Sequence, residues 1–318
     1  MPMNNTVADS CNCGQSVKSP TLSVVLPIYQ EADIIHDILI NLLDVLTKSN
    51  VTFEVIAVED GSTDGTADIL QALKSQYAGV LFVVQHPYNK GNGAAIKTGI
   101  KMARGDIIAC MDADGQHNPQ DLLRMLPFMH EYDLVVGART NKYKGSWFRN
   151  FANQFYNRLA SWLTQFKIED LTSGFRLFRA SVVKRYVHLF PARFSYPTTS
   201  TLAFIKGGHN VKYVDIEVNV RQGSSSKIRI FRDGWRFLLL IFKIIVLFEP
   251  LKLFLPAAMA LFCLGIFSTV YSSCVLGRLY IPNSGVFLFV VSIVVLLLAF
   301  IAEQIAALQI IATEKRDI

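Results

Sequence analysis

The sequence has few cysteines, and their positions exclude a disulfide or zinc framework. It contains 5 among 318 residues. Cys11 and Cys13 lie in a polar leader, Cys110 lies in an apolar run, and Cys263 and Cys274 lie in a long hydrophobic run near the C-terminus. A zinc site needs a second pair of ligands, and a small secreted fold needs regularly spaced cysteines. The pattern therefore indicates a reducing compartment.

The N-terminal end lacks the apolar core of a signal peptide. Residues 1–20 contain no continuous hydrophobic run and include Asp9, which argues against a targeting segment. We interpret these residues as a mobile leader without an assigned function.

Long charge-free runs are confined to the last quarter of the chain. Residues 253–276 and 283–302 contain no charged side chain, and each run reaches the length of about 20 residues that a helix needs to cross a bilayer. We therefore expect residues 251–318 to form two transmembrane helices, at about 253–276 and 283–311, and a short tail. A pair of buried core helices is the less favoured interpretation at this length.

Basic residues dominate the segment that precedes these runs. Between residues 221 and 252 there are seven basic residues and two acidic ones, within a chain of net charge +6. The positive-inside rule predicts a multi-pass protein of the cell inner or plasma membrane, with the large domain and both termini cytoplasmic. Anionic headgroups explain the basic excess better than nucleic acid does, so we expect membrane lipids, and no nucleic acid, as partners. Residues 231–250 favour interfacial amphipathic helices over a buried soluble helix.

The first two thirds of the chain alternate between strand and helix patterns. Apolar runs at residues 22–28, 53–58, 80–84, 106–111 and 133–139 predict five strands, and most are followed by leucines and isoleucines at helical spacing. Such alternation predicts an α/β domain over residues 21–230, with a Rossmann-like, mostly parallel sheet and flanking helices. A further helix at 147–166 and a strand at 211–220 are also expected.

Polar side chains follow the ends of four of these strands. They are Tyr29 to Glu31, Asp60 to Asp64, Asp112 to Gln116, and Arg139. Open α/β sheets bind ligands at the carboxyl ends of their strands, so we expect these groups to share one site.

Asp112 and Asp114 flank a single residue after a buried strand, and Gln116 follows closely. Hard oxygen donors in this number suit Mg²⁺ or Mn²⁺, which leave positions for diphosphate oxygens. Taken alone, the stretch also fits an ordinary turn before a helix that starts near Pro119. Asn89 to Ala95 forms a glycine-rich helix start without dinucleotide or Walker spacing, so phosphate binding and a plain tight turn both remain open.

Six motifs lie along the first two thirds of the chain: Pro27 to Glu31, Glu59 to Thr66, Asn89 to Gly91, Asp112 to His117, Gly137 with Arg139, and Thr172 to Arg176. Taken together, these motifs resemble those of the GT-A fold, family 2 polyprenyl-phosphate glycosyltransferases, which include dolichol-phosphate mannose synthases and bactoprenol glucosyltransferases. The resemblance covers roughly residues 21–230, and the two C-terminal spans are similar to the bactoprenol type. The sequence carries Gln30 where the family commonly has Asn, and it lacks the Gln-x-x-Arg-Trp motif of processive synthases.

The resemblance implies roles for named residues. Metal binding falls to Asp112, Asp114 and Gln116, and the catalytic set is Asp112, Asp114, Asp170 and Arg139, with Asp170 either a base or the group that orients an arginine. The nucleotide sugar would contact Pro27, Tyr29, Glu31, Asp60, Asp64, Lys90, Gly91, Asp112 and Ala113. The acceptor phosphate would contact Arg139, Arg176, Lys227 and Arg229; for Arg176 and Arg229, a solvated surface charge is the competing interpretation.

The implied function is an inverting, metal-dependent hexosyltransferase that uses Mg²⁺ or Mn²⁺ and acts on polyprenyl phosphate. UDP-glucose is the favoured donor and GDP-mannose the next. Transfer to another lipid, such as a diacylglycerol or sphingolipid, is the alternative within enzymes. A membrane-tethered scaffold that only binds nucleotide sugar is the alternative outside them. Polar residues late in the second span leave contacts within a homo-oligomer open.

Overall fold

The computed structural model describes residues 20–139, 147–192, 195–218 and 249–314, together with residues 242 and 246. The expected leader, except for residue 20, and nearly all of the expected interfacial helices lie outside the described residues. Lys227 and Arg229 lie outside them as well.

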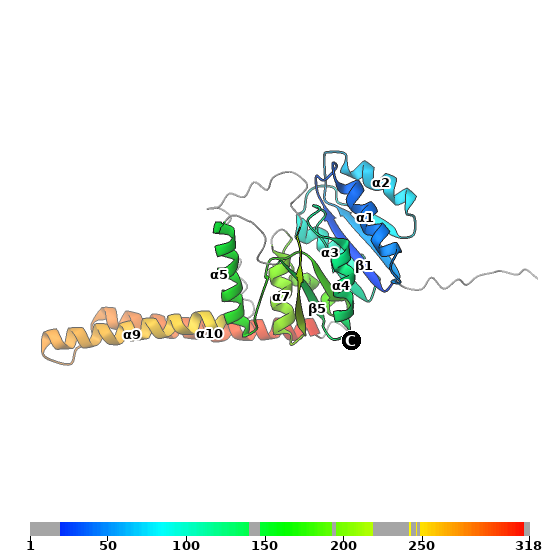
Figure 1. Cartoon of the computed structure of the whole chain (residues 1–318). Helices are drawn as coiled ribbons and strands as arrows, with labels where there is room; N and C mark the ends of the chain where they lie inside the picture. The colour runs from blue at the N-terminus through cyan, green and yellow to red at the C-terminus, as the bar shows by residue number, and fades with distance from the viewer. Residues whose placement is uncertain are drawn as a thin grey trace, which may run out of the picture.

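A seven-stranded sheet forms the centre of the N-terminal domain, in the order β3-β2-β1-β4-β6-β5-β7 (Figure 1). The strands are β1 (Leu22–Ile28), β2 (Phe53–Glu59), β3 (Leu81–Gln85), β4 (Ile107–Cys110), β5 (Leu134–Arg139), β6 (Arg176–Arg179) and β7 (Val211–Ile216). Each of the five strands expected before residue 140 is present. All neighbouring strands pair in parallel except for β6, which is antiparallel to both β4 and β5.

Helices cover both faces of the sheet. Successive side chains of β1 point to opposite faces, so each face has apolar side chains that a helix layer buries. Leu22, Val24 and Leu26 pack with α1, α2 and α4 on one face, whereas Val25 packs with α3, α6 and α7 on the other. This two-sided burial explains the nearly continuous apolar strands. The helices are α1 (Ile35–Thr47), α2 (Thr66–Gln76), α3 (Asn92–Met102), α4 (Pro119–Met125), α5 (Trp147–Thr164), α6 (Ala180–Tyr186) and α7 (Tyr196–Lys206), with short 3₁₀ turns at Leu126–His130 and Val187–Leu189.

The short strand β6 is the part of the sheet that the sequence pattern does not reveal. Its four residues begin and end with arginine, and the pattern places Arg176 in a turn. In the structure, Cys110 of β4 lies opposite Arg176 in an antiparallel register. The loop that precedes β6 therefore emerges at the edge where β4 ends.

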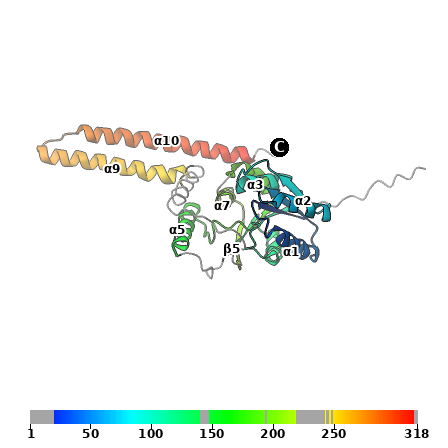
Figure 2. The ribbon, with the colours of Figure 1, turned by 90° about the horizontal axis from the view of Figure 1, so that it is seen from above.

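Two long apolar helices, α9 (Pro250–Leu276) and α10 (Asn283–Glu314), extend side by side away from the sheet (Figures 1 and 2). Both are long and apolar enough to cross a membrane. Most of their large side chains are exposed, including Phe267 at 68% and Leu297 at 57%. Buried core helices would hide these side chains, so that interpretation is wrong. Ser292 of α10 donates a 2.9 Å hydrogen bond to the Ala258 carbonyl of α9, which holds the hairpin together.

Candidate functional site

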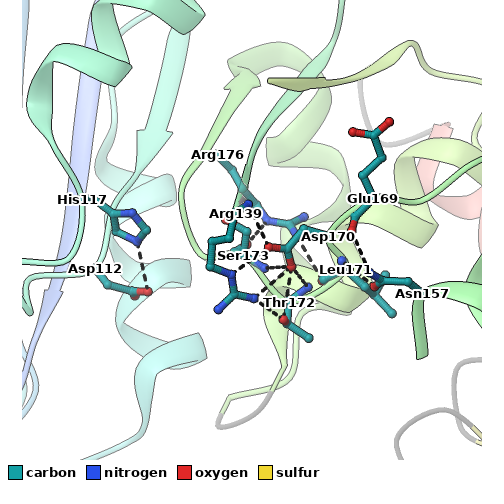
Figure 3. Close-up of polar contacts among 10 residues, drawn as sticks. All are labelled: Asp112, His117, Arg139, Asn157, Glu169, Asp170, Leu171, Thr172, Ser173 and Arg176. Carbon is teal, nitrogen blue, oxygen red and sulfur yellow. Dashed lines mark hydrogen bonds and ion pairs between the residues drawn. The ribbon is translucent and has the colours of Figure 1, made fainter. Parts of the chain in front are cut away.

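Most of the predicted site residues that the structure describes lie at one edge of the sheet, which we call the carboxyl edge. It consists of the residues that follow β1, β2, β3 and β4 and of Arg139 at the end of β5, together with residues 168–175, which lead into β6. The first five groups meet there because their strands are mutually parallel, and the sixth joins them because β6 runs in the opposite direction. Figure 3 shows the central part of this edge, from Asp112 to Asn157.

Asp112 lies directly beyond β4, and its side chain is 33% exposed. Asp114 accepts a 3.2 Å hydrogen bond from the backbone N–H of Gln116, which closes the turn. A Cβ atom at Gly174 would overlap the carboxylate of Asp112. Glycine therefore lets the loop before β6 come this close to Asp112, and a larger residue would force the Asp112 carboxylate to move.

His117 packs beside Asp112, although no separate role was predicted for it from the sequence. Its side chain is 6% exposed, its ring stacks on Phe175 at a centroid distance of 5.0 Å, and Nε2 lies 4.0 Å from Oδ2 of Asp112. Nδ1 is buried and has no hydrogen-bond partner among the described residues. Burial lowers the pKa of His117, and nearby Asp112 only partly offsets this effect. This shift favours the neutral form of the imidazole.

The turn at residues 112–116 carries the kind of oxygen donors that bind a hard divalent cation. Asp112 and Asp114 offer carboxylate oxygens and Gln116 an amide oxygen, the donors that Mg²⁺ and Mn²⁺ prefer. Among the described residues, no three His, Cys, Asp or Glu side chains form a preformed metal cage. Mg²⁺ sites commonly use one or two carboxylates and complete the shell with substrate phosphates and waters. The residues present suit that kind of site.

Arg139 and Asp170 form a two-point ion pair across the same edge. Nε of Arg139 donates to Oδ2 of Asp170 at 2.8 Å, and Nη2 donates to Oδ1 at 2.9 Å. Nη2 also donates to the hydroxyl of Thr172 at 2.6 Å. This parallel arrangement fixes the plane of the guanidinium. The Arg139 side chain remains 32% exposed.

The ionisation of Asp170 bears on its expected role as a base or as an orienting group. Burial raises the pKa of Asp170, but hydrogen bonds and charge from Arg139 more than offset burial and bring the pKa below its ordinary value. Asp170 also accepts the backbone N–H groups of Thr172 and Ser173, each at 3.1 Å. A buried carboxylate with this many donors is a poor proton acceptor. Its geometry favours the orienting role.

Arg176 does not lie where a ligand phosphate can reach it. Its side chain is fully buried, and its guanidinium donates to the carbonyls of Ser173 and Leu171 and to the hydroxyls of Ser200 and Thr201. Both interpretations made from the sequence, phosphate contact and a solvated surface charge, are therefore wrong. The arginine instead ties the loop before β6 to helix α7.

Asp60, expected to contact the nucleotide, is only 2% exposed. Its oxygens accept the N–H groups of Lys90 at 3.0 Å and Gly91 at 2.7 Å, and Nδ1 of His86 lies 2.7 Å away. The glycine-rich stretch is thus a turn held by Asp60. The N–H of Ala94 in the first turn of α3 also has an internal partner, because it donates to the carbonyl of Ala192 at 2.7 Å. This placement favours the tight-turn interpretation over phosphate binding.

Asp64 connects the residues that follow β1 to those that follow β2. It accepts the N–H of Ala32 at 3.1 Å and both the N–H and the hydroxyl of Thr66, at 3.2 and 2.6 Å. Glu31 is half-buried beside this junction, and its N–H donates to the Thr66 hydroxyl at 3.2 Å. Asp64 therefore shapes the edge near Glu31.

Two exposed tyrosines lie at the carboxyl edge, after β1 and after β3. Tyr29 after β1 is 42% exposed, and Tyr88 after β3 is 65% exposed. Nζ of Lys90 lies 5.8 Å from the centre of the Tyr88 ring. Pro27 is half-buried, whereas Ala113 is buried. The nucleotide contacts predicted for these residues remain predictions.

Sequence comparisons relate the two parts of the chain to known families. Residues 23–187 match the family described as glycosyl transferase family 2, and residues 249–308 match the GtrB C-terminal hairpin. A dodecaprenyl-phosphate galacturonate synthase of Rhizobium johnstonii is 31% identical over 185 residues, 58% of this chain and 55% of the relative. An undecaprenyl-phosphate 4-deoxy-4-formamido-L-arabinose transferase of Edwardsiella ictaluri is 29% identical over 167 residues, 52% of this chain and 51% of the relative. The chain spans about half the length of these curated relatives.

Solved structures agree with the fold. A glucosyl-3-phosphoglycerate synthase from Mycobacterium tuberculosis, in complex with Mn²⁺ and UDP-glucose, superposes with a TM-score of 0.54 at 18% identity, over 71% of this chain and 78% of that one. At this identity the likeness concerns the fold, which is a GT-A-like sheet with flanking helices. Because the matched sequence region at residues 23–187 covers more than half of the chain, the chain belongs to glycosyl transferase family 2.

Proposed function

We propose that the chain moves one hexose from a nucleotide sugar to polyprenyl phosphate, with inversion, at the cytoplasmic face of a membrane. The observation that carries the proposal is the oriented pair of Arg139 and Asp170 on the edge that also bears Asp112. An acidic pair suits a diphosphate donor, and a fixed guanidinium suits a phosphate acceptor. The two apolar helices and the lipid-phosphate acceptors named for the relatives support the membrane setting.

On the donor side, Asp112, Asp114 and Gln116 would hold the divalent cation. When bound, the cation neutralises charge that develops on the departing nucleotide diphosphate. His117 lies against Asp112 and is itself supported by its stack on Phe175. Tyr29 offers an exposed ring for the nucleotide.

On the acceptor side, the lipid phosphate already carries an anionic oxygen, so transfer needs orientation more than deprotonation. Arg139 binds this phosphate in our proposal, and Asp170 fixes the direction of its guanidinium. Asp170 acts as a carboxylate throughout, in keeping with its lowered pKa. Lys227 and Arg229 stay in the proposal as further phosphate contacts from the basic segment.

The sugar donor is proposed from the family resemblance and from the names of the relatives. UDP-glucose is favoured, as in the resemblance to the bactoprenol type, and GDP-mannose is the second candidate. The curated relatives carry names that specify galacturonate and 4-deoxy-4-formamido-L-arabinose, so nucleotide-linked forms of these two sugars belong in the test as well.

The test incubates the purified full chain in detergent with Mg²⁺ or Mn²⁺, polyprenyl phosphate and each labelled donor separately. A chloroform-soluble labelled sugar phosphate from one donor is the expected result. Replacing polyprenyl phosphate by a diacylglycerol or a sphingolipid separates the alternative acceptors. Donor binding without any product, across all donors and lipids, would contradict transfer and favour the scaffold alternative.

A further inference from the structure

Helix α5 is attached to the loop that carries Asp170 through three polar contacts. The side-chain amide of Asn157 donates to the carbonyl of Glu169 at 2.7 Å and accepts the N–H of Leu171 at 3.1 Å (Figure 3). One turn later, the hydroxyl of Ser161 accepts the N–H of Ile168 at 2.9 Å. One asparagine thus binds the backbone on both sides of Asp170.

These contacts leave the Asp170 side chain directed toward Arg139. Because Asn157 fixes residues 169 and 171, the residue between them has little freedom to rotate. The Asp170 carboxylate in turn receives both Nε and Nη2 of Arg139. A chain of contacts therefore runs from Asn157 through the backbone to the guanidinium plane.

The apolar side of the same junction reaches the first turn of α9. Tyr156 and Ala160 of α5 form a buried cluster with Ile168 and Leu171, and Leu253 of α9 packs against that cluster. Helix α5 thus lies between the Asp170 loop and the start of the membrane-spanning hairpin. A lipid phosphate at the headgroup level would approach the enzyme from this side.

We propose that Asn157 is a positioning residue for the acceptor phosphate, acting through Asp170 on Arg139. The inference rests on the proposed function and adds a residue outside the predicted site. Asn157 does not contact the substrate. It sets the angle at which Arg139 meets the lipid phosphate, and its two described hydrogen bonds go to Glu169 and Leu171 rather than to the turn at Asp112.

The test compares wild type, Asn157→Ala and Asn157→Asp as full chains in the polyprenyl phosphate transfer assay. Substitution of a residue that orients a binding group typically costs about 10- to 100-fold in affinity or activity. We expect Asn157→Ala to raise the KM for polyprenyl phosphate about tenfold, at the low end of that range, with the KM for the nucleotide sugar unchanged. Asn157→Asp keeps the acceptor for the Leu171 N–H but turns a carboxylate oxygen toward the Glu169 carbonyl, so it should raise the same KM. It also provides a second variant with one anchor intact.

Gln154→Ala is the matched control, because Gln154 is exposed one turn earlier on α5. It should match wild type in both KM values. A purely structural role for Asn157 would lower kcat with the loss of folded protein and leave both KM values unchanged, which would overturn the inference. Wild-type kinetics in Asn157→Ala would overturn it too. Absence of transfer by the wild-type chain, by contrast, would contradict the proposed function itself.

Discussion

The two halves of the carboxyl edge use their carboxylates differently. In the half built on β1, β2 and β3, Asp60 and Asp64 accept hydrogen bonds from the backbone of neighbouring loops. In the half built on β4, β5 and β6, Asp112 is one-third exposed and Asp170 holds the side chain of Arg139. The first half is a rigid frame for the loops, and the second half presents charged groups with defined directions. The chemistry should therefore depend most on the second half.

The largest expected effect is at the acidic pair. Asp114→Ala should lower transfer by at least about a thousandfold, because charge stabilisation by a bound cation is worth several kcal/mol. Initial rates with saturating Mg²⁺ or Mn²⁺ measure the effect. Asp37→Ala is the control, since the Asp37 side chain is 91% exposed on α1. Full activity in Asp114→Ala would contradict a metal site in this half of the edge.

Arg139→Lys should lower kcat/KM for polyprenyl phosphate by about a hundredfold, because lysine lacks the planar fork that Asp170 orients. Another Arg–Asp pair offers a control. Arg179 donates to Asp133 at 2.7 Å at the other end of β6, so Arg179→Lys should change thermal stability and leave kcat/KM nearly unchanged. Equal losses of activity in both variants would show that the effect of Arg139 is not specific to the acceptor.

Gly174→Ala tests the close approach between the loop before β6 and the acidic pair. The added Cβ would overlap the Asp112 carboxylate, so activity should fall about tenfold through misplacement of that group. Gly105→Ala meets similarly close atoms near Ser23, but it lies at the opposite edge of the sheet. It should lower stability without a specific loss of activity. A Gly174→Ala enzyme with wild-type rates would mean that the approach is not functional.

The smallest expected effect is on the pH dependence of thermal stability. Because the folded pKa of Asp170 is lowered, its carboxylate stabilises the folded state above the unfolded pKa of about 3.9. That contribution is lost as the pH falls through the folded pKa. Wild type should therefore exceed Asp170→Asn in thermal midpoint near pH 6, and the gap should narrow below about pH 4. Detergent-solubilised full chain can be measured by scanning fluorimetry. A difference in thermal midpoint that widens on acidification would contradict an Asp170 carboxylate that is ionised and paired with Arg139.

The sequence predicts the frame of the enzyme better than the details of its edge. The five strands before residue 140 and the apolar hairpin follow from local patterns that each segment carries by itself. Strand β6 does not, because it has four residues and an arginine at each end. Its place in the sheet depends on pairing with β4 and β5.

The candidate site divides in the same way. The strand-end motifs place Asp112 and Arg139 at one edge, as in the structure, whereas Asp170 reaches that edge from the loop before β6, where it pairs with Arg139. Burial of Arg176 depends on Ser200 and Thr201, which lie 24 and 25 residues further along the chain. No local pattern reveals such partners. The structural use of Asp60 likewise depends on backbone groups that lie 30 residues away.

If Arg139 in the second half of the edge binds the acceptor, transfer must depend on the phosphate of the acceptor lipid. This dependence is measured by comparing transfer of labelled sugar to polyprenyl phosphate and to the matching polyprenol, with the same chain, donor and divalent cation. We expect product with polyprenyl phosphate alone, and a large loss of that product in Arg139→Lys. Comparable transfer to the phosphate-free polyprenol would contradict recognition of the phosphate.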